Sequence, residues 1–165
     1  MIQTLIDKQF LFFYMNEEDV KIIDLENHET KDNRDEHTNG SLTVVWRDWD
    51  NIIKDELKMI YVTSINPGET KGPHLHTKRN SYFTCIHGEV IFIIKKKSGQ
   101  YQEIRAKADT PTLIFIPKNV PAAHINTSNS ISRVLTLADV SWEPNDKEMK
   151  NITFDDYNWK KWKGV

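Results

Sequence analysis

Short runs of β-branched and aromatic residues recur along the chain, and turn-forming residues separate them. Typical turn signals between the runs are Asn66-Pro67-Gly68, His87-Gly88 and Pro117-Lys118-Asn119. Strands spaced roughly 8–12 residues apart, with little helical periodicity between them, favour a β-sandwich or barrel. The pattern therefore predicts an all-β fold with strands at Ser41–Trp46, Met59–Ile65, Ser81–Ile86, Glu89–Ile94, Leu113–Ile116 and Ser132–Leu137.

Two segments have helical character. The first is Asp48–Leu57, and the second is a short C-terminal helix at Asp155–Trp162. The second has aspartates at its start and lysines near its end, as the helix dipole favours. The polar, unpatterned segment His28–Asn39 is predicted to be a loop. Because the chain has no internal repeat and no Gly/Ser-rich linker, residues 1–165 are expected to form a single domain.

Charge and composition exclude several classes of protein. The chain has 22 Lys+Arg against 24 Asp+Glu, a formal net charge of −2, which gives no basic field to attract nucleic acid. No apolar run approaches the ~20 residues that span a bilayer, so no membrane partner is expected. Asp7 and Lys8 interrupt the first apolar residues, so a signal peptide is not predicted. Cys85 is the single cysteine, and we expect a cytoplasmic protein without a disulfide.

The segment Lys71–His76 (KGPHLH) carries the most informative pattern. Side chains alternate along a strand, so His74 and His76 are expected to point to the same face. Two imidazoles on a barrel-lining face either bind a metal or supply acid–base groups near neutral pH. Further along, His124 stands two residues after Ala122, so on a strand these two side chains also share a face.

These motifs resemble the two sequence blocks of the cupin superfamily, each of which maps onto a β-hairpin of a small jelly-roll barrel. The first block, G-x5-HxH-x(3–4)-E-x6-G, is similar to the stretch from Gly68 through the two histidines to Gly88, and the second begins at Pro117. The glutamate ligand position holds Ser81, and the second-block histidine position holds Ala122. The resemblance therefore implies a barrel without metal or cofactor whose histidines do proton chemistry.

A metal site remains the alternative. His124 faces the same way as Ala122 on a strand, so it can replace the missing histidine ligand. A set of three histidines, His74, His76 and His124, would hold zinc or iron with open coordination positions.

Within the superfamily, the chain is most similar to isomerases and epimerases of nucleotide sugars. The dTDP-sugar 3,4-ketoisomerases carry K-R-V-F-Y-I, R-G-x-H-A-H-K and C-x-S-G, which look like Leu57–Val62, Lys71–His76 and Cys85–Gly88. This resemblance covers about residues 36–145, between an N-terminal extension of about 1–35 and a tail at 146–165. It implies a cupin-type jelly roll.

The dTDP-4-dehydrorhamnose 3,5-epimerases are similar in part. Their R-G-L-H-F-Q looks like Lys71–His76, but their catalytic lysine would fall near Ser81 and their catalytic tyrosine near Ser141 or Trp142. Both families usually have an arginine where this chain has Lys71. A lysine keeps the positive charge but loses the fork that grips a diphosphate.

The resemblance implies a nucleotide-linked 4-keto-6-deoxyhexose as substrate and a reaction that begins with loss of a proton alpha to the ketone. Such an enzyme needs a base with a pKa near ambient pH and a partner for the enediolate. We expect His74 to be the base, His76 to carry a second proton, and Tyr61 to donate a hydrogen bond or proton. The candidate substrate-binding residues are Lys71, Arg79, Ser81 and His124. A 3,5- or 3-epimerase, the metal-binding cupin and a non-catalytic sugar-binding protein remain alternatives.

The apolar run Phe10–Met15 precedes the matched region. A patch of that kind is rarely left in water by a soluble monomer, and exposed strand edges invite pairing with another chain. Related sugar cupins are commonly dimers, so the resemblance implies a two-fold homodimer built partly from residues 1–15 and the strand near Ser41–Trp46. The alternative is that Phe10–Met15 folds back as one more strand of its own barrel.

Overall fold

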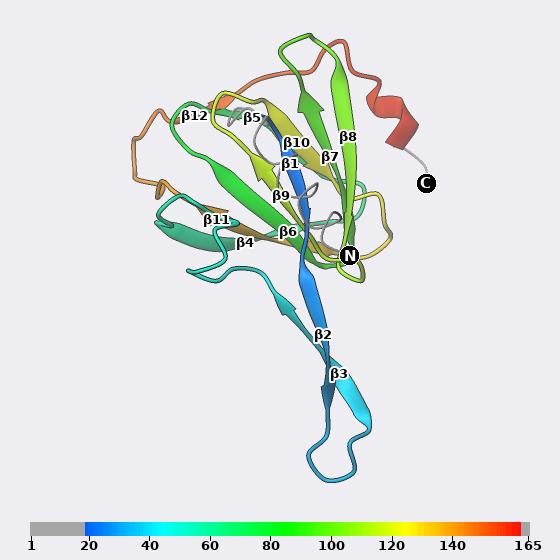
Figure 1. Ribbon diagram of the computed structural model, residues 1–165. Coiled ribbons are helices and arrows are strands. Elements are labelled where there is room, and N and C mark those ends of the chain that lie inside the picture. The colour runs from blue at the N-terminus through cyan, green and yellow to red at the C-terminus, as the bar shows by residue number, and fades with distance from the viewer. Residues whose placement is uncertain (1–18, 163–165) are drawn as a thin grey trace, which may run out of the picture.

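The computed structural model describes residues 19–162, which form a nearly all-β molecule (Figure 1). The strands of this part are β1 (Lys21–Asp24), β2 (Glu26–Lys31), β3 (Thr38–Val44), β4 (Met59–Ile65), β5 (Thr70–His76), β6 (Ser81–His87), β7 (Glu89–Lys95), β8 (Tyr101–Lys107), β9 (Thr112–Ile116), β10 (Ala122–Ile125), β11 (Ser132–Ala138) and β12 (Met149–Asn151). A 3-10 helix, η2 (Trp159–Trp162), follows them.

Two five-stranded antiparallel sheets pack face to face and confirm the predicted all-β jelly roll. The first sheet has the order β1-β9-β6-β11-β4, and the second has the order β12-β5-β10-β7-β8. β1 comes from the N-terminal extension and β12 from the C-terminal tail, so both ends of the chain contribute strands to the barrel. No helix within residues 19–162 has the length and apolar character needed to cross a membrane.

The strands at the centre of each sheet are buried on both faces. On β7, Val90, Phe92 and Ile94 point into the core between the sheets, while Ile91 and Ile93 pack on the outer face. The segment from Ile152 to Trp162 covers that outer face, mainly through Phe154 and Tyr157. This two-sided burial explains why Glu89–Ile94 is almost continuously apolar instead of alternating.

The predicted helix at Asp48–Leu57 is wrong. This segment contains turns and bends, and its Ile53 packs on the outer face of the first sheet. The Asp50 carboxylate accepts a hydrogen bond from the backbone N–H of Ile52 at 3.1 Å. A side chain that bonds to the nearby backbone competes with helix formation, and the packing of Ile53 then fixes the irregular path. The C-terminal helix is shorter than predicted, because it is confined to Trp159–Trp162.

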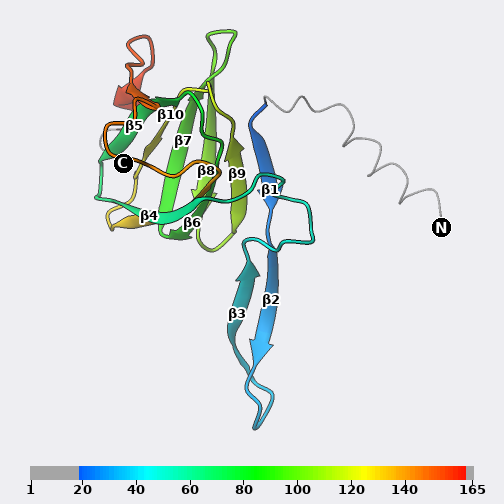
Figure 2. The same ribbon diagram turned by 90° about the vertical axis from the view of Figure 1, so that its left-hand side faces the viewer.

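The predicted loop at His28–Asn39 is confirmed only for residues 32–37, because the other half of this segment belongs to a ribbon of β2 and β3. The two strands pair from Glu26 opposite Val44 to Lys31 opposite Thr38, and the ribbon projects away from both sheets (Figures 1 and 2). A ribbon with both faces in water has no reason to alternate polar and apolar residues, so the usual strand pattern is missing. The run Phe10–Met15 lies outside the described residues.

An irregularity in β5 shapes the site. Ala122 pairs with His74 and His124 pairs with Lys71, so β5 has one residue more than β10 between these pairs. Gly72 lies within it, with a φ of 86°, and a Cβ there would be 2.9 Å from the carbonyl oxygen of Ala122. A bulge of this kind re-aims side chains, and here it brings Lys71 and His74 to the same cavity although they are three residues apart.

We predict that Gly72→Ala destabilises the protein more than Gly99→Ala. Both glycines have a positive φ, which costs an alanine about 1 kcal/mol, but a Cβ on Gly99 meets nothing within 4 Å. A Cβ on Gly72 meets backbone atoms that cannot move without disturbing β10. Urea unfolding of both variants measures the difference, and equal losses of stability would contradict this account of β5.

Candidate active site

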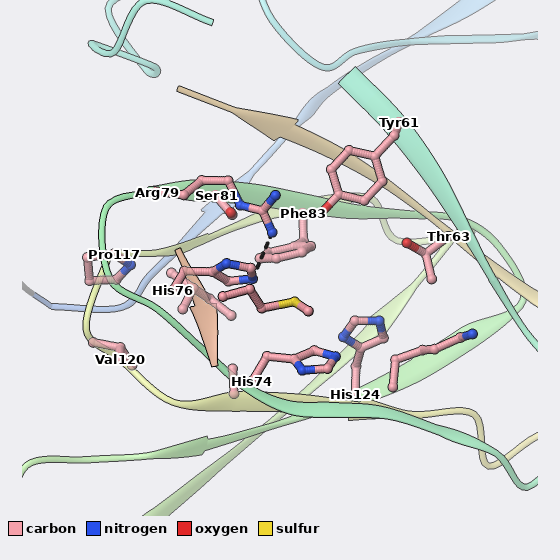
Figure 3. Close-up of a pocket in the computed structure, with 14 residues that line it drawn as sticks. Tyr61, Thr63, His74, His76, Arg79, Ser81, Phe83, Pro117, Val120 and His124 are labelled. Carbon is pink, nitrogen blue, oxygen red and sulfur yellow. Dashed lines mark hydrogen bonds between the residues drawn. The ribbon is translucent and has the colours of Figure 1, made fainter. Parts of the chain in front are cut away.

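A cavity of about 220 Å³ lies between the inner faces of the two sheets. It brings together all seven site residues predicted from the sequence, from Tyr61 on β4 to His124 on β10 (Figure 3). The full lining consists of Tyr61, Thr63, Lys71, His74, His76, Arg79, Ser81, Phe83, Ile116, Pro117, Val120, Ala122, His124 and Met149.

His74 is held by a residue of the C-terminal tail. Its Nδ1 lies 3.0 Å from the Oδ1 of Asn151, which stands opposite His74 in the pairing of β12 with β5. A carbonyl oxygen only accepts, so Nδ1 carries the proton and Nε2 keeps its lone pair. Burial, together with the charges of Arg79 and Lys71, lowers the pKa of His74 despite the hydrogen bond to Asn151. His74 is therefore neutral at pH 7.

His76 has partners at both ring nitrogens. Its Nδ1–H donates to a carboxylate oxygen of Glu148 at 2.9 Å, and its Nε2 accepts from a terminal nitrogen of Arg79 at 2.7 Å. Burial and the Arg79 charge lower the pKa of His76, although Glu148 acts in the opposite direction. Burial raises the pKa of Glu148, but the hydrogen bond from His76, the charges of His76 and Arg79 and the hydrogen bond from the Arg79 backbone together outweigh it and lower that pKa. The carboxylate is therefore ionised beside a neutral imidazole.

His124 lies deepest of the three histidines. Its ring packs against Phe92 and Phe83, at centroid distances of 5.2 and 6.1 Å. Its Nε2 is buried and has no hydrogen-bond partner within the described part of the chain. Burial lowers the pKa of His124 to about 4, so it is neutral in the folded protein. His124 and Ala122 both line the cavity, as expected from their spacing.

The other predicted residues differ in exposure. Arg79 is only 8% exposed and Ser81 only 2%, whereas Lys71 is exposed at the cavity. The Arg79 guanidinium carbon lies 5.8 Å from the centre of the Tyr61 ring, and the Tyr61 side chain points into the cavity (Figure 3). The His74 imidazole, the Tyr61 phenol and the buried Arg79 cation thus line one small cavity.

Sequence reasoning missed Glu148 and Asn151. They stand 72 residues after His76 and 77 residues after His74, and no local motif links them to the histidines. Only the pairing of β12 with β5 brings them there, supported by the hydrogen bond from the Thr77 backbone N–H to the Glu148 carbonyl oxygen at 3.0 Å. Glu148 and Asn151 could have been predicted only by recognising that the tail returns to pair with β5.

The geometry does not favour the three-histidine metal site. The Arg79 guanidinium already donates to the Nε2 of His76. Its positive charge repels a metal cation at the same nitrogen. Within residues 19–162, the one group of three potential ligand residues close enough to share an ion is Asp32, Asp35 and His37, at the exposed end of the β2–β3 ribbon.

Two packed antiparallel sheets with a histidine-lined cavity between them define this protein as a cupin-type jelly roll. The family model described as "FdtA: WxcM-like, C-terminal" matches residues 18–158. The chain therefore belongs to this family, which confirms the resemblance drawn from its motifs. No curated protein matches the chain.

Solved structures with the same fold share little sequence with this chain. A dTDP sugar isomerase from Desulfovibrio desulfuricans G20 has a TM-score of 0.73 and 15% identity, over 87% of this chain and 92% of that one. QdtA, a sugar 3,4-ketoisomerase from Thermoanaerobacterium thermosaccharolyticum, has a TM-score of 0.63 and 19% identity over 90% and 93% of the two chains. ChmJ, a 3'-monoepimerase from Streptomyces bikiniensis, has a TM-score of 0.65 and 12% identity over 81% and 69%.

We predict that His124→Phe makes stability less dependent on pH. Below about pH 6.5, His124 takes up a proton in the unfolded chain but stays neutral in the folded one until about pH 4. The free energy of unfolding of the wild type therefore falls as the pH falls through this window, by about 2 kcal/mol between pH 7 and pH 5 from this residue.

Urea unfolding of the wild type and His124→Phe at several pH values tests this contribution. The exposed residue His87 provides a matched control through His87→Phe. If His124→Phe lost as much stability as the wild type between pH 7 and pH 5, the buried neutral state of His124 would be contradicted.

Proposed function

We propose that this protein is an isomerase of nucleotide-linked 4-keto-6-deoxyhexoses that takes a proton from the carbon alpha to the ketone, as a 3,4-ketoisomerase does. Family membership and the folds of QdtA and ChmJ support the broader class, an enzyme that isomerises or epimerises dTDP-linked sugars. The site geometry supports the proton-transfer mechanism.

The observation that carries this proposal is the state of His74. Asn151 holds its Nδ1–H, which leaves the Nε2 lone pair without a partner among the described residues. The lowered pKa keeps the imidazole neutral at pH 7, so the base is in its active form. A positioned neutral imidazole beside a cavity is what proton abstraction from a sugar carbon requires.

The proposed reaction needs no external oxidant or reductant. His74 takes the proton from C3, the C–H electron pair forms a C=C bond, and the ketone electrons move onto the oxygen at C4. A proton then returns to C4, the oxygen at C4 takes up a second proton, and the hydroxyl at C3 loses its proton to become the new ketone. Tyr61 is proposed to donate to a sugar oxygen during these steps. The proton-carrying role expected of His76 stays a prediction, because Arg79 donates to its Nε2.

The same first step serves an epimerase, which returns the proton to the opposite face of the same carbon. Lys71 is proposed to contact the diphosphate in either case, because it is the exposed cation of the cavity. The position of the exchanged hydrogen separates the reactions. After incubation with dTDP-4-keto-6-deoxyglucose in deuterated water, proton NMR should show deuterium at C4 of the 3-keto product for a ketoisomerase and at C3 of the 4-keto sugar for a 3-epimerase. Exchange at C3 and C5 indicates a double epimerase.

We predict that His74→Asn reduces both exchange and conversion by about 10²–10⁴-fold, because a positioned general base contributes that much. Folding and dTDP binding should be nearly unchanged, since His74 faces a cavity and not the core. His28→Asn on the exposed ribbon is the matched control. More than a tenth of the wild-type activity in His74→Asn would remove His74 from the role of base.

Stoichiometric iron, zinc or manganese in the purified protein would instead favour the metal-binding alternative.

We also propose that the protein is a homodimer. The β2–β3 ribbon projects from the barrel (Figure 2), and an isolated two-stranded ribbon is marginally stable in water. On the edge strand β4, Ile60 and Val62 are more than 45% exposed, at 59% and 49%. Light scattering should give twice the chain mass at micromolar concentration. A monomer would contradict the proposal, and a tight dimer after removal of residues 1–15 would place the interface elsewhere.

A further inference from the structure

A buried cation lines the cavity together with the proposed base. Arg79 lies just before β6, is 8% exposed, and approaches the cavity from a different side than His74 (Figure 3). A guanidinium remains charged at every pH at which proteins are folded. Its charge reaches His74, because it contributes to the lowered pKa of that imidazole. The proposed base therefore faces a fixed positive charge within one cavity.

The guanidinium is held by a chain of hydrogen bonds that ends on a carboxylate. Arg79 donates to the Nε2 of His76 at 2.7 Å, and the Nδ1–H of His76 donates to Glu148 at 2.9 Å. The backbone N–H of Arg79 also donates to Glu148, at 3.3 Å. The carboxylate fixes the tautomer of His76, and His76 in turn presents its lone pair to Arg79. Glu148 thus orients the cation and balances its charge through an intervening ring.

Two donors on this wall have no partner. The Nε–H of Arg79 and the hydroxyl of Ser81 are both buried, and neither has a hydrogen-bond partner among the described residues. Buried polar groups in proteins are paired in the great majority of cases. Arg79 and Ser81 are two residues apart in the chain, and both line the same cavity.

We propose that Arg79 and Ser81 form the oxyanion site of the enzyme, in which they stabilise the negative charge that develops on the ketone oxygen when His74 removes the alpha proton. His76 and Glu148 are positioning residues that aim the guanidinium. This inference rests on the function proposed above and deepens it. It gives Arg79 a more specific role than the substrate binding expected from the sequence. A buried guanidinium in the cavity of the proposed base suits the reacting oxygen, whereas exposed Lys71 suits the diphosphate.

The charge balance of the step follows from these positions. When the C–H proton moves to His74, the imidazole becomes a cation and the enediolate becomes an anion. Arg79 and Ser81 donate to that anion, and they need no reorganisation because Glu148 already holds the arginine through His76. Preorganised donors of this kind typically contribute 10²–10³-fold to the rate each.

Arg79→Met tests the proposal, because methionine keeps much of the side-chain length and removes the charge and the donors. We expect the kcat for conversion of dTDP-4-keto-6-deoxyglucose to fall by about 10²–10³-fold. The affinity for dTDP, measured by calorimetry, should change less than about threefold, or about 0.7 kcal/mol, because dTDP lacks the sugar oxygen that Arg79 is proposed to contact. Arg105→Met removes an exposed arginine from β8 and is the matched control, with wild-type kcat.

Three further variants keep the test valid if loss of one buried charge harms folding. Arg79→Met combined with Glu148→Gln removes both charges, so neither is left unbalanced, and should be as slow as Arg79→Met. Glu148→Gln alone should lower kcat by about tenfold with little change in KM, as loss of preorganisation alone would do. In Arg79→Ala, added guanidinium ion at millimolar concentration should restore part of the kcat, which a purely structural role of Arg79 does not allow.

The outcomes separate this inference from the proposed function. A wild type that exchanges sugar hydrogens while Arg79→Met keeps kcat within about threefold overturns the oxyanion site and leaves the function standing. Weakened dTDP binding with unchanged kcat assigns Arg79 to the diphosphate and also overturns it. Absence of rescue by guanidinium in a folded Arg79→Ala variant counts against it as well. A wild type without any exchange overturns both proposals.

Discussion

The pairing of β12 with β5 is the interaction on which the site depends. Three residues of the tail lie against the strand that carries both histidines, with Met149 opposite His76 and Asn151 opposite His74. Without this pairing, the Nδ1 atoms of both imidazoles would lose their partners, because Glu148 and Asn151 come from the tail. The aromatic residues that follow, Phe154 and Tyr157, bury themselves on the outer face of the same sheet and hold the tail in place. Packing of the tail on the outer face of the sheet therefore keeps Glu148 and Asn151 beside the two histidines.

Burial sets the protonation states of the histidines in the cavity, because few charged groups lie near them. Each of the three histidines is driven towards the neutral form, mainly by burial, and the effect is greatest at His124. One buried cation, Arg79, remains beside them and is balanced through His76 by Glu148. Removing either member of such an arrangement leaves the other charge uncompensated, which is why paired charges survive in interiors. The result is a neutral imidazole, His74, that shares the cavity with a positive group held in place by hydrogen bonds.

The sequence predicted the strands that are buried on both faces, since β7 and β9 need uninterrupted apolar residues whatever their neighbours are. It missed β8, whose run from Tyr101 to Lys107 mixes charged and apolar residues. It also assigned the tip-side residues of the exposed β2–β3 ribbon, 28–31 and 38–39, to a loop. It also placed a helix where Asp50 bonds to the nearby backbone. The spacing of apolar residues reflects which side chains are buried. It therefore does not predict a strand that lies in water, or a segment whose backbone path is set by local side-chain hydrogen bonds.

The seven predicted site residues all line one cavity because a local motif and strand alternation suffice to place most of them. Lys71 is the instructive case: an even alternation would turn it away from His74, and only the extra residue of β5 at Gly72 brings both to the cavity. The orienting groups Glu148 and Asn151 are non-local, and no single-sequence pattern encodes which distant strand will pair with β5. At 12–19% identity the fold persists in QdtA and ChmJ. Doubly buried strands require apolar volume more than particular residues. Differences in reaction must therefore arise from the few polar side chains that these pairings aim into the cavity, such as Arg79 and Ser81 here.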